Sequence, residues 1–184
     1  PVKSIPPKHL FNDVNYTLDV LPGVSMENRS IRHNVKTISQ NSQHDKDGEH
    51  QFVPFYTLND VFSNFFECSF TIDGISYNTT EQFLFAEKAK HVGDNENMER
   101  IMRNRSARIC KQIGEHDIQW NGGNLETWRQ FAKEKLKIAN IAKYSQNSNL
   151  RKTLFATAPK ILVEASPVDV FWGVGLKKSD KVIQ

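Results

Sequence analysis

The chain has 184 residues, of which 38% are hydrophobic, and a net charge of +3 from 24 basic and 21 acidic side chains. This length suits one domain of ordinary size with a tail, and so mild a charge is by itself no argument for nucleic-acid binding. No apolar stretch approaches the ~20 residues that a membrane helix needs, and the N-terminus lacks the basic and apolar segments of a secretory signal. We therefore expect an intracellular, cytoplasmic protein without a membrane partner.

Two cysteines and six histidines limit the redox and metal chemistry. Cys68 and Cys110 lie far apart among apolar neighbours, which is typical of buried free thiols in a reducing compartment. The histidines show no ligand spacing with cysteines or acids, so we expect no structural metal site.

The first fifty residues differ in composition from the rest of the chain. Asn, Ser, Gln, His and Asp dominate them, most densely at residues 40–48, and large apolar residues are sparse. Such a segment cannot bury enough apolar surface to offset its chain entropy. We predict a disordered tail or linker over residues 1–50, with a short strand near residues 16–21, and an ordered domain over residues 51–184.

The first ordered stretch predicts three short strands. Residues 51–56 are typical of an edge strand, because Pro54 has no N–H to donate to a sheet. Residues 69–72 and 75–77 flank Asp-Gly at 73–74, and two strands around Asp-Gly predict a hairpin with a type I′ turn.

Apolar periodicity and capping residues then predict a series of helices. Their ranges are 81–91, 96–103, 107–113, 125–144 and 149–157. Thr79 is the expected N-cap of the first helix and forms a capping box with Gln82, and Gly93 ends that helix. In the third helix Ser106 is the expected N-cap and Gly114 the expected stop.

The longest helix begins after Asn124, its expected N-cap. Its apolar stripe consists of Trp128, Ala132, Leu136 and Ala139. Pro159 then breaks the chain ahead of a buried strand at residues 161–163. Strands, then helices, then a strand indicate an α+β fold, here a mainly helical single domain with a small antiparallel sheet.

The first helix carries two ionisable side chains on one face. Glu81, Phe85 and Lys88 share that face because steps of four and seven residues nearly complete whole turns. The helix is apolar nearly all round, and a desolvated lysine near an acid can lose its charge and attack a carbonyl or a sugar C1. A structural ion pair has the same sequence pattern, so that alternative stays open.

Residues 161–176 combine a buried strand with acids, an indole and glycines. Glu164 and Asp169 bracket a small polar turn, and Trp172 and Gly173 follow. Acids at a strand end, and glycines that let a ligand approach the backbone, are typical of a binding cleft. The alternative is an ordinary loop capped by one buried tryptophan. A lysozyme-like carboxylate pair is also conceivable, because the sequence does not give the separation that would decide it.

From residue 51 onward the chain resembles the NADAR family, also called YbiA-like. The matching motifs, in chain order, are Phe-Ser-Asn-Phe at 62–65, Phe-Thr-Ile-Asp-Gly at 70–74, Thr-Glu-Gln-Phe at 80–83, Ala-Glu-Lys-Ala at 86–89, Cys-Lys-Gln-Ile-Gly at 110–114, Trp128, Lys-Tyr-Ser-Gln-Asn at 143–147, Leu-Val-Glu-Ala-Ser-Pro at 162–167, Asp169 and Trp-Gly-Val-Gly-Leu at 172–176. Their order and spacing extend over the last 130 or so residues, which makes chance a poor explanation.

The resemblance implies an N-glycosidase that cleaves the bond between a base nitrogen and ribose C1 without a metal or other cofactor. The substrates it implies are ribosylamino-pyrimidine phosphates of riboflavin synthesis and ADP-ribose attached to guanine in nucleic acid. The expected partners are thus a small nucleotide or ADP-ribosyl substrate, and ADP-ribosylated nucleic acid.

The resemblance also implies a set of site residues, carried over by position. Lys88 is expected to attack ribose C1 and form a Schiff base, with Glu81 moving protons. Asp169 is expected to protonate the leaving nitrogen or to stabilise an oxocarbenium-like centre. The implied substrate-binding residues are Asn64, Phe65, Trp128, Trp172 and Gly173. In this scheme Glu164 is interpreted as a structural acid that anchors the turn after its strand.

The chain departs from the family pattern at three places. Gln82 stands where a histidine is common, and Glu115 stands where an arginine usually supplies a plausible phosphate contact. The chain also stops at Gln184, before the Asn-Leu-Gly motif and closing helix that the resemblance implies, so we expect the domain to lack its C-terminal helix. These departures keep two alternatives open: a module that binds ADP-ribose or a nucleotide without cleaving it, and an interaction protein that acts through residues 1–50.

Overall fold

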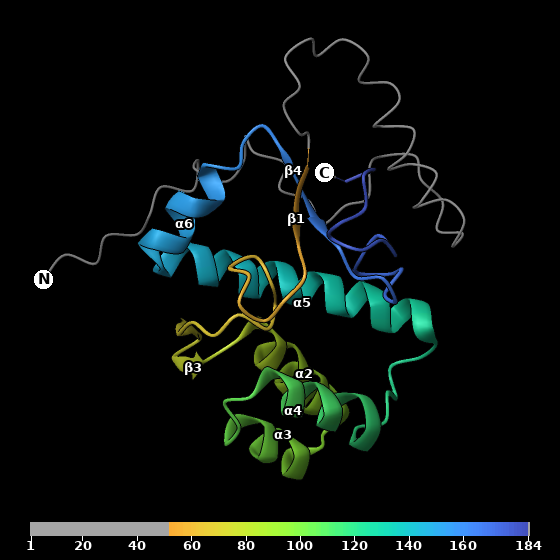
Figure 1. Cartoon of the computed structure of the whole chain (residues 1–184). Helices are drawn as coiled ribbons and strands as arrows, with labels where there is room; N and C mark the ends of the chain where they lie inside the picture. The colour runs from red at the N-terminus through yellow and green to blue at the C-terminus, as the bar shows by residue number, and fades with distance from the viewer. Residues whose placement is uncertain (1–51, 184) are drawn as a thin grey trace, which may run out of the picture.

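A long central helix divides the molecule in the computed structural model, which describes residues 52–183. Helix α5 crosses the middle, with α2, α3 and α4 on one side of it and β1, β4 and α6 on the other (Figure 1). In chain order the elements are β1 (Phe52–Phe55), β2 (Phe70–Ile72), β3 (Ile75–Tyr77), α2 (Thr80–Val92), α3 (Asn95–Met102), α4 (Ala107–Gln112), the π-helical turn η2 (Ile113–Asp117), α5 (Leu125–Gln146), α6 (Ser148–Phe155) and β4 (Ile161–Glu164). The tail predicted over residues 1–50 and its strand near 16–21 lie outside the described residues. The mainly helical α+β prediction is confirmed.

The predicted antiparallel hairpin is present as β2 and β3. Phe70 pairs with Tyr77 and Ile72 with Ile75. The turn residues Asp73 and Gly74 have φ values of 51° and 80°, and a type I′ turn requires positive φ at both positions.

The strands predicted at residues 51–56 and 161–163 are present as β1 and β4, but their pairing with each other was not predicted. β1 and β4 run parallel, with Phe52 opposite Ile161 and Phe55 opposite Glu164. Parallel strands need a long connection rather than a tight turn, and here the connection contains every helix of the described residues. The pairing therefore brings the end of the described chain back to its beginning.

Helix α2 begins after Thr79 and ends at Gly93 as predicted, but the Gln82 side chain accepts its backbone hydrogen bond from Asn78 instead of from Thr79, as a capping box would require. The Thr79 hydroxyl accepts a hydrogen bond from the backbone N–H of Gln82, and Gly93 ends the helix at a φ of 76°. The Gln82 amide group accepts a hydrogen bond from the Asn78 N–H at 2.8 Å and donates one to the Asn104 carbonyl at 2.8 Å. Gln82 therefore ties α2 to the connection between α3 and α4.

The prediction that Gly114 ends the third helix is wrong. The chain continues from α4 into η2, and Gly114 is the second residue of this π-helical turn. A Cβ atom at position 114 would lie 1.9 Å from Cδ1 of Phe85 and would overlap the aromatic ring. The glycine is needed here because η2 packs directly against α2.

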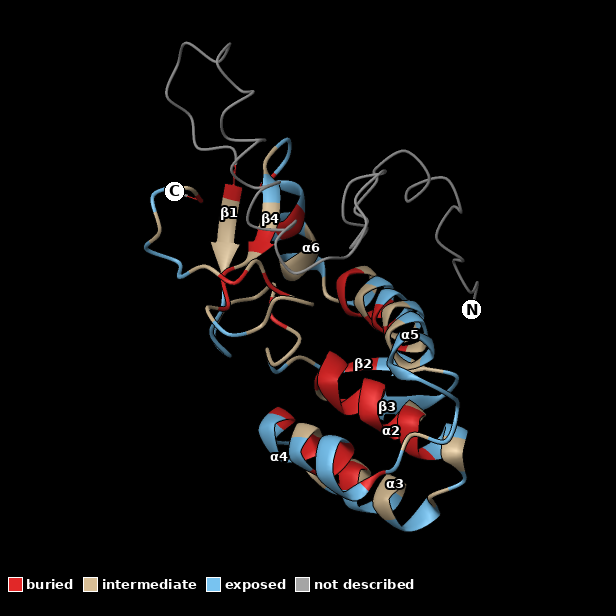
Figure 2. Cartoon of the chain, turned by 90° about the vertical axis from the view of Figure 1, so that its right-hand side faces the viewer, coloured by how far each residue is buried: buried red, intermediate tan, exposed pale blue. Residues whose placement is uncertain are grey.

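The main hydrophobic core is built around α2. Nearly every residue from Thr80 to Ala89 is buried, and Figure 2 shows this helix between α5 and the α3–α4 pair. A smaller cluster joins Phe52 and Val163 of the parallel strands to Ile183 near the end of the described chain. Both cysteines are free thiols, Cys110 buried and Cys68 half-buried. Between residues 52 and 183, no helix combines the length and apolarity needed to cross a bilayer.

Candidate active site

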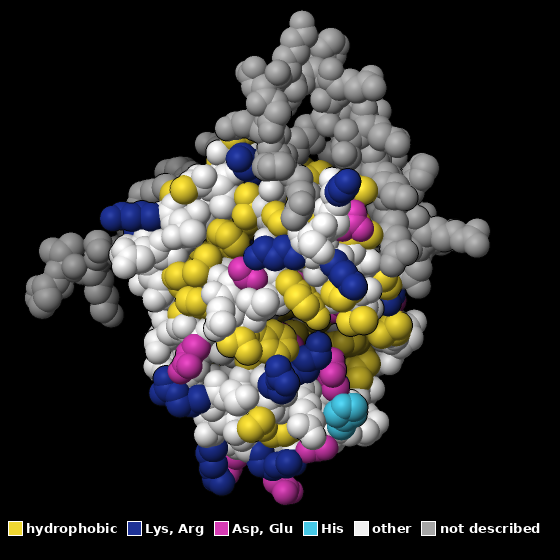
Figure 3. Space-filling model, viewed as in Figure 1, with side chains coloured by type: hydrophobic (Ala, Val, Ile, Leu, Met, Phe, Trp, Pro, Cys, Tyr) yellow, Lys and Arg dark blue, Asp and Glu magenta, His cyan; other side chains and the backbone are white. Residues whose placement is uncertain are grey.

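A cavity of about 230 Å³ lies where α2, α4, η2 and α5 meet the loops that follow β1 and β4. Its lining residues are Ser63, Asn64, Phe65, Glu81, Leu84, Phe85, Lys88, Lys111, Glu115, Trp128, Leu136, Glu164, Asp169 and Trp172. On the face shown in Figure 3, hydrophobic, basic and acidic side chains surround a hollow near the centre of the molecule.

The cavity brings together seven of the eight residues expected at the site. They are Asn64, Phe65, Glu81, Lys88, Trp128, Asp169 and Trp172. Gly173 is the exception, since it is not among the lining residues of the described structure. A Cβ atom on Gly173 would lie 2.9 Å from the carbonyl oxygens of Asp169 and Glu164, so this glycine permits close packing behind the cavity wall.

Lys88 is buried, with only 7% of its surface exposed, and hydrogen bonds hold its amine in a defined position. Its Nζ donates hydrogen bonds to the carbonyls of Gly114 at 2.7 Å and Ile118 at 3.0 Å. Burial lowers the pKa of this amine, against the opposing effect of Glu115. The two carbonyls accept hydrogen bonds from two N–H groups of the amine. The charged amine has a third N–H group left, and the neutral amine has a lone pair in its place.

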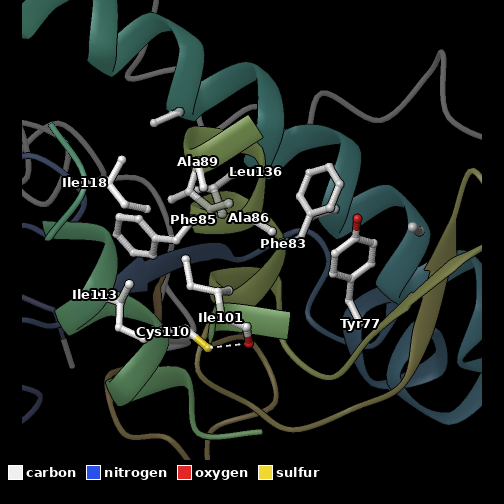
Figure 4. Packing of buried hydrophobic residues seen from close by; sticks show 14 of the residues in the cluster. Tyr77, Phe83, Phe85, Ala86, Ala89, Ile101, Cys110, Ile113, Ile118 and Leu136 are labelled. Carbon is white, nitrogen blue, oxygen red and sulfur yellow. Dashed lines mark hydrogen bonds between the residues drawn. The ribbon is translucent and has the colours of Figure 1, made fainter. Parts of the chain in front are cut away.

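The indole of Trp128 packs close to this amine. Nζ of Lys88 lies 4.9 Å from the centroid of the Trp128 ring, which in turn stacks on Phe85 at 6.2 Å. Figure 4 shows the Phe85 side chain between Ile113 and Ile118. The π-helical turn and Ile118 directly after it thus supply both an apolar wall and the two carbonyls that hold Lys88.

Glu81 occupies the first turn of α2 and is 6% exposed. Burial raises the pKa of its carboxyl group to about 7. Lys111 opposes this shift, whereas the neighbouring acids Glu115, Glu164 and Asp169 add to it. Glu81 therefore retains its proton at a pH where an exposed glutamate has lost it.

Asp169 organises the loop that follows β4. Its Oδ1 accepts hydrogen bonds from the backbone N–H groups of Phe171 at 2.8 Å and Trp172 at 2.9 Å. The rings of Phe171 and Trp172 meet edge to face at 4.5 Å. The carboxylate therefore fixes the indole against the cavity while it also lines the cavity itself.

Glu164 is an acid of the cavity, which the sequence interpretation did not assign to the site. It is the last residue of β4 and lines the cavity together with Asp169. Burial raises the pKa of Glu164 to about 7, with Asp169 adding to the shift and Lys111 opposing it. The apolar run before Glu164 could have indicated this placement from the sequence, because an acid at the end of a buried strand lies at the edge of the core.

Lys111 and Glu115 were also absent from the predicted site. They span the junction of α4 and η2, with Nζ and Oε1 3.5 Å apart. Burial disfavours the charged form of Lys111, but Glu81, Glu115 and Asp169 together outweigh it and raise the pKa of this amine. Lys111 is thus a persistent cation among four carboxyl groups, and it lies 5.8 Å from the ring centroid of Phe65.

The loop that carries Asn64 and Phe65 is fastened to α2 and α5. Oδ1 of Asn64 accepts hydrogen bonds from the Thr80 hydroxyl at 2.9 Å and from the Asn140 amide at 3.3 Å. Lys143, fully buried, donates from Nζ to the Ser63 carbonyl at 2.9 Å, and burial lowers the pKa of Lys143 to about 8. With Oδ1 engaged, the Asn64 amide N–H₂ is the part of this side chain left to meet a substrate.

The residues described between 52 and 183 contain no cluster of three or more histidine, cysteine or acidic side chains arranged to hold a metal ion.

Comparison with known proteins points to one family. The NADAR domain pattern matches residues 52–184. The chain is 33% identical to Protein irg-1 of Caenorhabditis elegans, over 71% of this chain and 68% of that protein. It is 32% identical to N-glycosidase R617 of Acanthamoeba polyphaga mimivirus, over 66% of this chain and 73% of that protein.

The structure is similar to that of a protein solved by NMR, Escherichia coli YbiA. The TM-score is 0.57 at 28% identity, covering 71% of this chain and 77% of the other. The E. coli K12 sequence named N-glycosidase YbiA is 31% identical over 67% of this chain and 75% of its own length. These names confirm the predicted enzyme class, a hydrolase acting on N-glycosyl bonds. Because the domain match extends from β1 to the end of the sequence, the chain belongs to the NADAR (YbiA-like) family.

Proposed function

We propose that this chain hydrolyses the bond between a base nitrogen and ribose C1 in an ADP-ribosylated guanine or in a ribosylamino-pyrimidine phosphate. The observation that carries the proposal is the face of α2 that presents Lys88 and Glu81 to one cavity walled by two tryptophans. The names of the relatives support it, since two are N-glycosidases and a 28% identical one is a riboflavin biosynthesis protein of Vibrio vulnificus.

In the first step the neutral amine of Lys88 attacks ribose C1. The lone pair of Nζ forms the new C–N bond, and the bond from C1 to the base nitrogen breaks with its electron pair going to the base. Glu81, which keeps its proton up to about pH 7, or Asp169 supplies the proton that the departing nitrogen takes up. Trp172 and Phe65 hold the flat base between them.

In the second step the sugar is released. The amine loses a proton to the ring oxygen, the bond from C1 to that oxygen breaks to leave a hydroxyl group, and the lone pair of Nζ forms the C=N bond of a Schiff base between Lys88 and C1. Water then adds to C1, and proton transfer to Nζ expels the amine, which restores Lys88 and leaves free ribose phosphate or ADP-ribose. The carboxyl groups of Glu164 and Asp169 line the cavity. In this scheme one of them accepts the proton from this water.

Replacing Lys88 by Met tests the covalent step. We expect the wild-type protein to release free base from one of the two substrates, and the Lys88→Met variant to release it at the uncatalysed rate. Lys90→Met is the matched control, because Lys90 lies on the same helix but its side chain is 69% exposed, and this variant should keep full activity. Released base is measured by chromatography, and circular dichroism checks that both variants fold.

Two results would decide against the proposal. Full turnover by Lys88→Met would exclude the covalent mechanism. Ligand-dependent stabilisation of the wild-type protein without release of base from either substrate would show a binding module instead of an enzyme.

A further inference from the structure

Two cations of α5 lie against the ring of Phe171, in the loop that follows β4. Arg129 and Lys133 lie one turn apart on α5, and the part of the chain that the structure describes gives neither side chain an ion pair or a side-chain hydrogen bond. Both are half-buried, and both face the same aromatic ring. Cζ of Arg129 lies 4.4 Å, and Nζ of Lys133 5.6 Å, from the ring centroid of Phe171.

Phe171 connects the two cations to the cavity wall. Its ring contacts the ring of Trp172 edge to face at 4.5 Å, and Trp172 lines the cavity. Arg129 also directly follows Trp128, another lining residue of the cavity. The ring of Phe171 orients the cations through its face while leaving their N–H groups unused, since a cation–π contact satisfies no hydrogen bond.

Size and charge prevent a phosphorylated substrate from lying wholly inside the cavity. Its volume of about 230 Å³ is below the ~300–1,000 Å³ of pockets that enclose a drug-sized ligand. The lining carries four carboxyl groups against the two amines of Lys88 and Lys111, and Lys111 is already paired with Glu115. A ribose and a base suit these conditions, whereas the lining offers a phosphoryl group no amine beyond Lys111, which is paired, and Lys88, which the proposed reaction uses.

We propose that Arg129 and Lys133, held against Phe171, form the subsite that binds the phosphoryl group of the substrate. The inference rests on the proposed function and adds to it the place where the phosphate lies. A guanidinium and an ammonium one helical turn apart supply a planar pair of donors and a point charge, which together suit a phosphate monoester or a diphosphate. In this chain the two cations provide an anion contact on the α5 side of the cavity. The α4 side of the cavity instead presents the acid Glu115.

The test compares two doubly substituted proteins with the same change in net charge. One is Arg129→Gln with Lys133→Gln. The control is Lys137→Gln with Lys152→Gln, two lysines on exposed positions of α5 and α6. We expect the Kd for ADP-ribose, measured by calorimetry, to rise at least about tenfold in the first protein and to stay within about twofold in the control.

Turnover gives the second readout and separates the two sources of phosphate. On the ribosylamino-pyrimidine phosphate, kcat/KM should fall at least about tenfold in Arg129→Gln/Lys133→Gln, almost entirely through KM. On the dephosphorylated counterpart it should not change. The ADP-ribosylated guanine substrate should show the same loss if its diphosphate uses the subsite, and raising the salt concentration should reduce wild-type affinity more than that of the variant.

The outcomes distinguish this inference from the proposed function. If the wild-type protein binds ADP-ribose and the double substitution weakens that binding, the subsite stands even when no base is released. An unchanged Kd in the double variant, or an equal loss of kcat/KM on phosphorylated and dephosphorylated substrates, would overturn the subsite and leave the N-glycosidase proposal in place.

Discussion

At the scale of single residues, burial acts on Lys88 and Glu81 in opposite directions with one chemical result. It lowers the pKa of the amine and raises that of the carboxyl group to about 7. Both shifts favour the uncharged form, because the interior disfavours charge of either sign. Burial thus increases the share of Lys88 that carries a free lone pair and keeps a proton on Glu81 up to about pH 7. N-glycosyl cleavage needs such a nucleophile and such an acid.

The raised pKa of Glu81 predicts how stability depends on pH. The folded protein binds this proton more tightly than the unfolded chain, whose glutamate has its usual pKa of 4.5, so the stabilising contribution is complete below pH 4.5 and is lost as the pH rises through about 7. Glu81→Gln removes the titration, and at pH 8 its free energy of unfolding should exceed that of the wild type by up to about 3 kcal/mol. Near pH 4 the two should agree. Urea denaturation at several pH values measures this.

Glu134→Gln serves as the control for that series. Glu134 is an exposed acid of α5, and its replacement should leave the pH profile of stability as it is in the wild type. A Glu81→Gln profile that ran parallel to the wild-type profile from pH 4 to 8 would show that Glu81 titrates normally and would remove it as the proton donor.

At the scale of elements, the caps of α2 were predictable from sequence, whereas the turn η2 was not. Thr79 and Gly93 act through hydrogen bonds and dihedral angles within a few residues of themselves, so the local sequence contains the information. Gly114 looks like another helix stop but is required by the ring of Phe85, which lies 29 positions earlier in the sequence. A local pattern cannot report a contact that tertiary packing creates.

This contact makes Gly114→Ala a destabilising substitution. The added methyl group would overlap the Phe85 ring, and we expect a loss of about 1–3 kcal/mol in the free energy of unfolding. In a Phe85→Leu background, where the ring is gone, the same substitution should cost at least about 1 kcal/mol less. Thermal or urea unfolding of the four proteins measures the coupling, and costs that simply add would show that Phe85 is not the obstacle.

At the scale of the whole molecule, the sequence predicted the fold class and most of the site but not how the two halves of the site meet. The α+β order, the hairpin and the helices follow from local patterns, and the family resemblance supplied seven residues that do line the cavity. The parallel pairing of β1 with β4 joins segments more than a hundred positions apart, and no local pattern specifies it. That pairing places Glu164 at the cavity. Because the pairing was not predicted, this acid was interpreted from the sequence as a structural residue.

Gly173 illustrates the reverse case. Its neighbours Trp172 and Asp169 suggested a backbone open to a ligand, but the carbonyls of Glu164 and Asp169 fill the space beside it. The sequence shows that a glycine is present, whereas only the folded chain shows whether a ligand or another strand of backbone approaches it.

Trapping the Schiff base during turnover tests the central claim most directly. The whole protein is incubated with each substrate and sodium borohydride, which reduces an imine to a stable amine, and its intact mass and peptides are then measured. We predict an added mass equal to the reduced sugar fragment, located on Lys88, present also in Lys90→Met and absent from Lys88→Met. Release of base by the wild-type protein without any adduct, or an adduct on a different lysine, would contradict the assignment of Lys88 as the nucleophile.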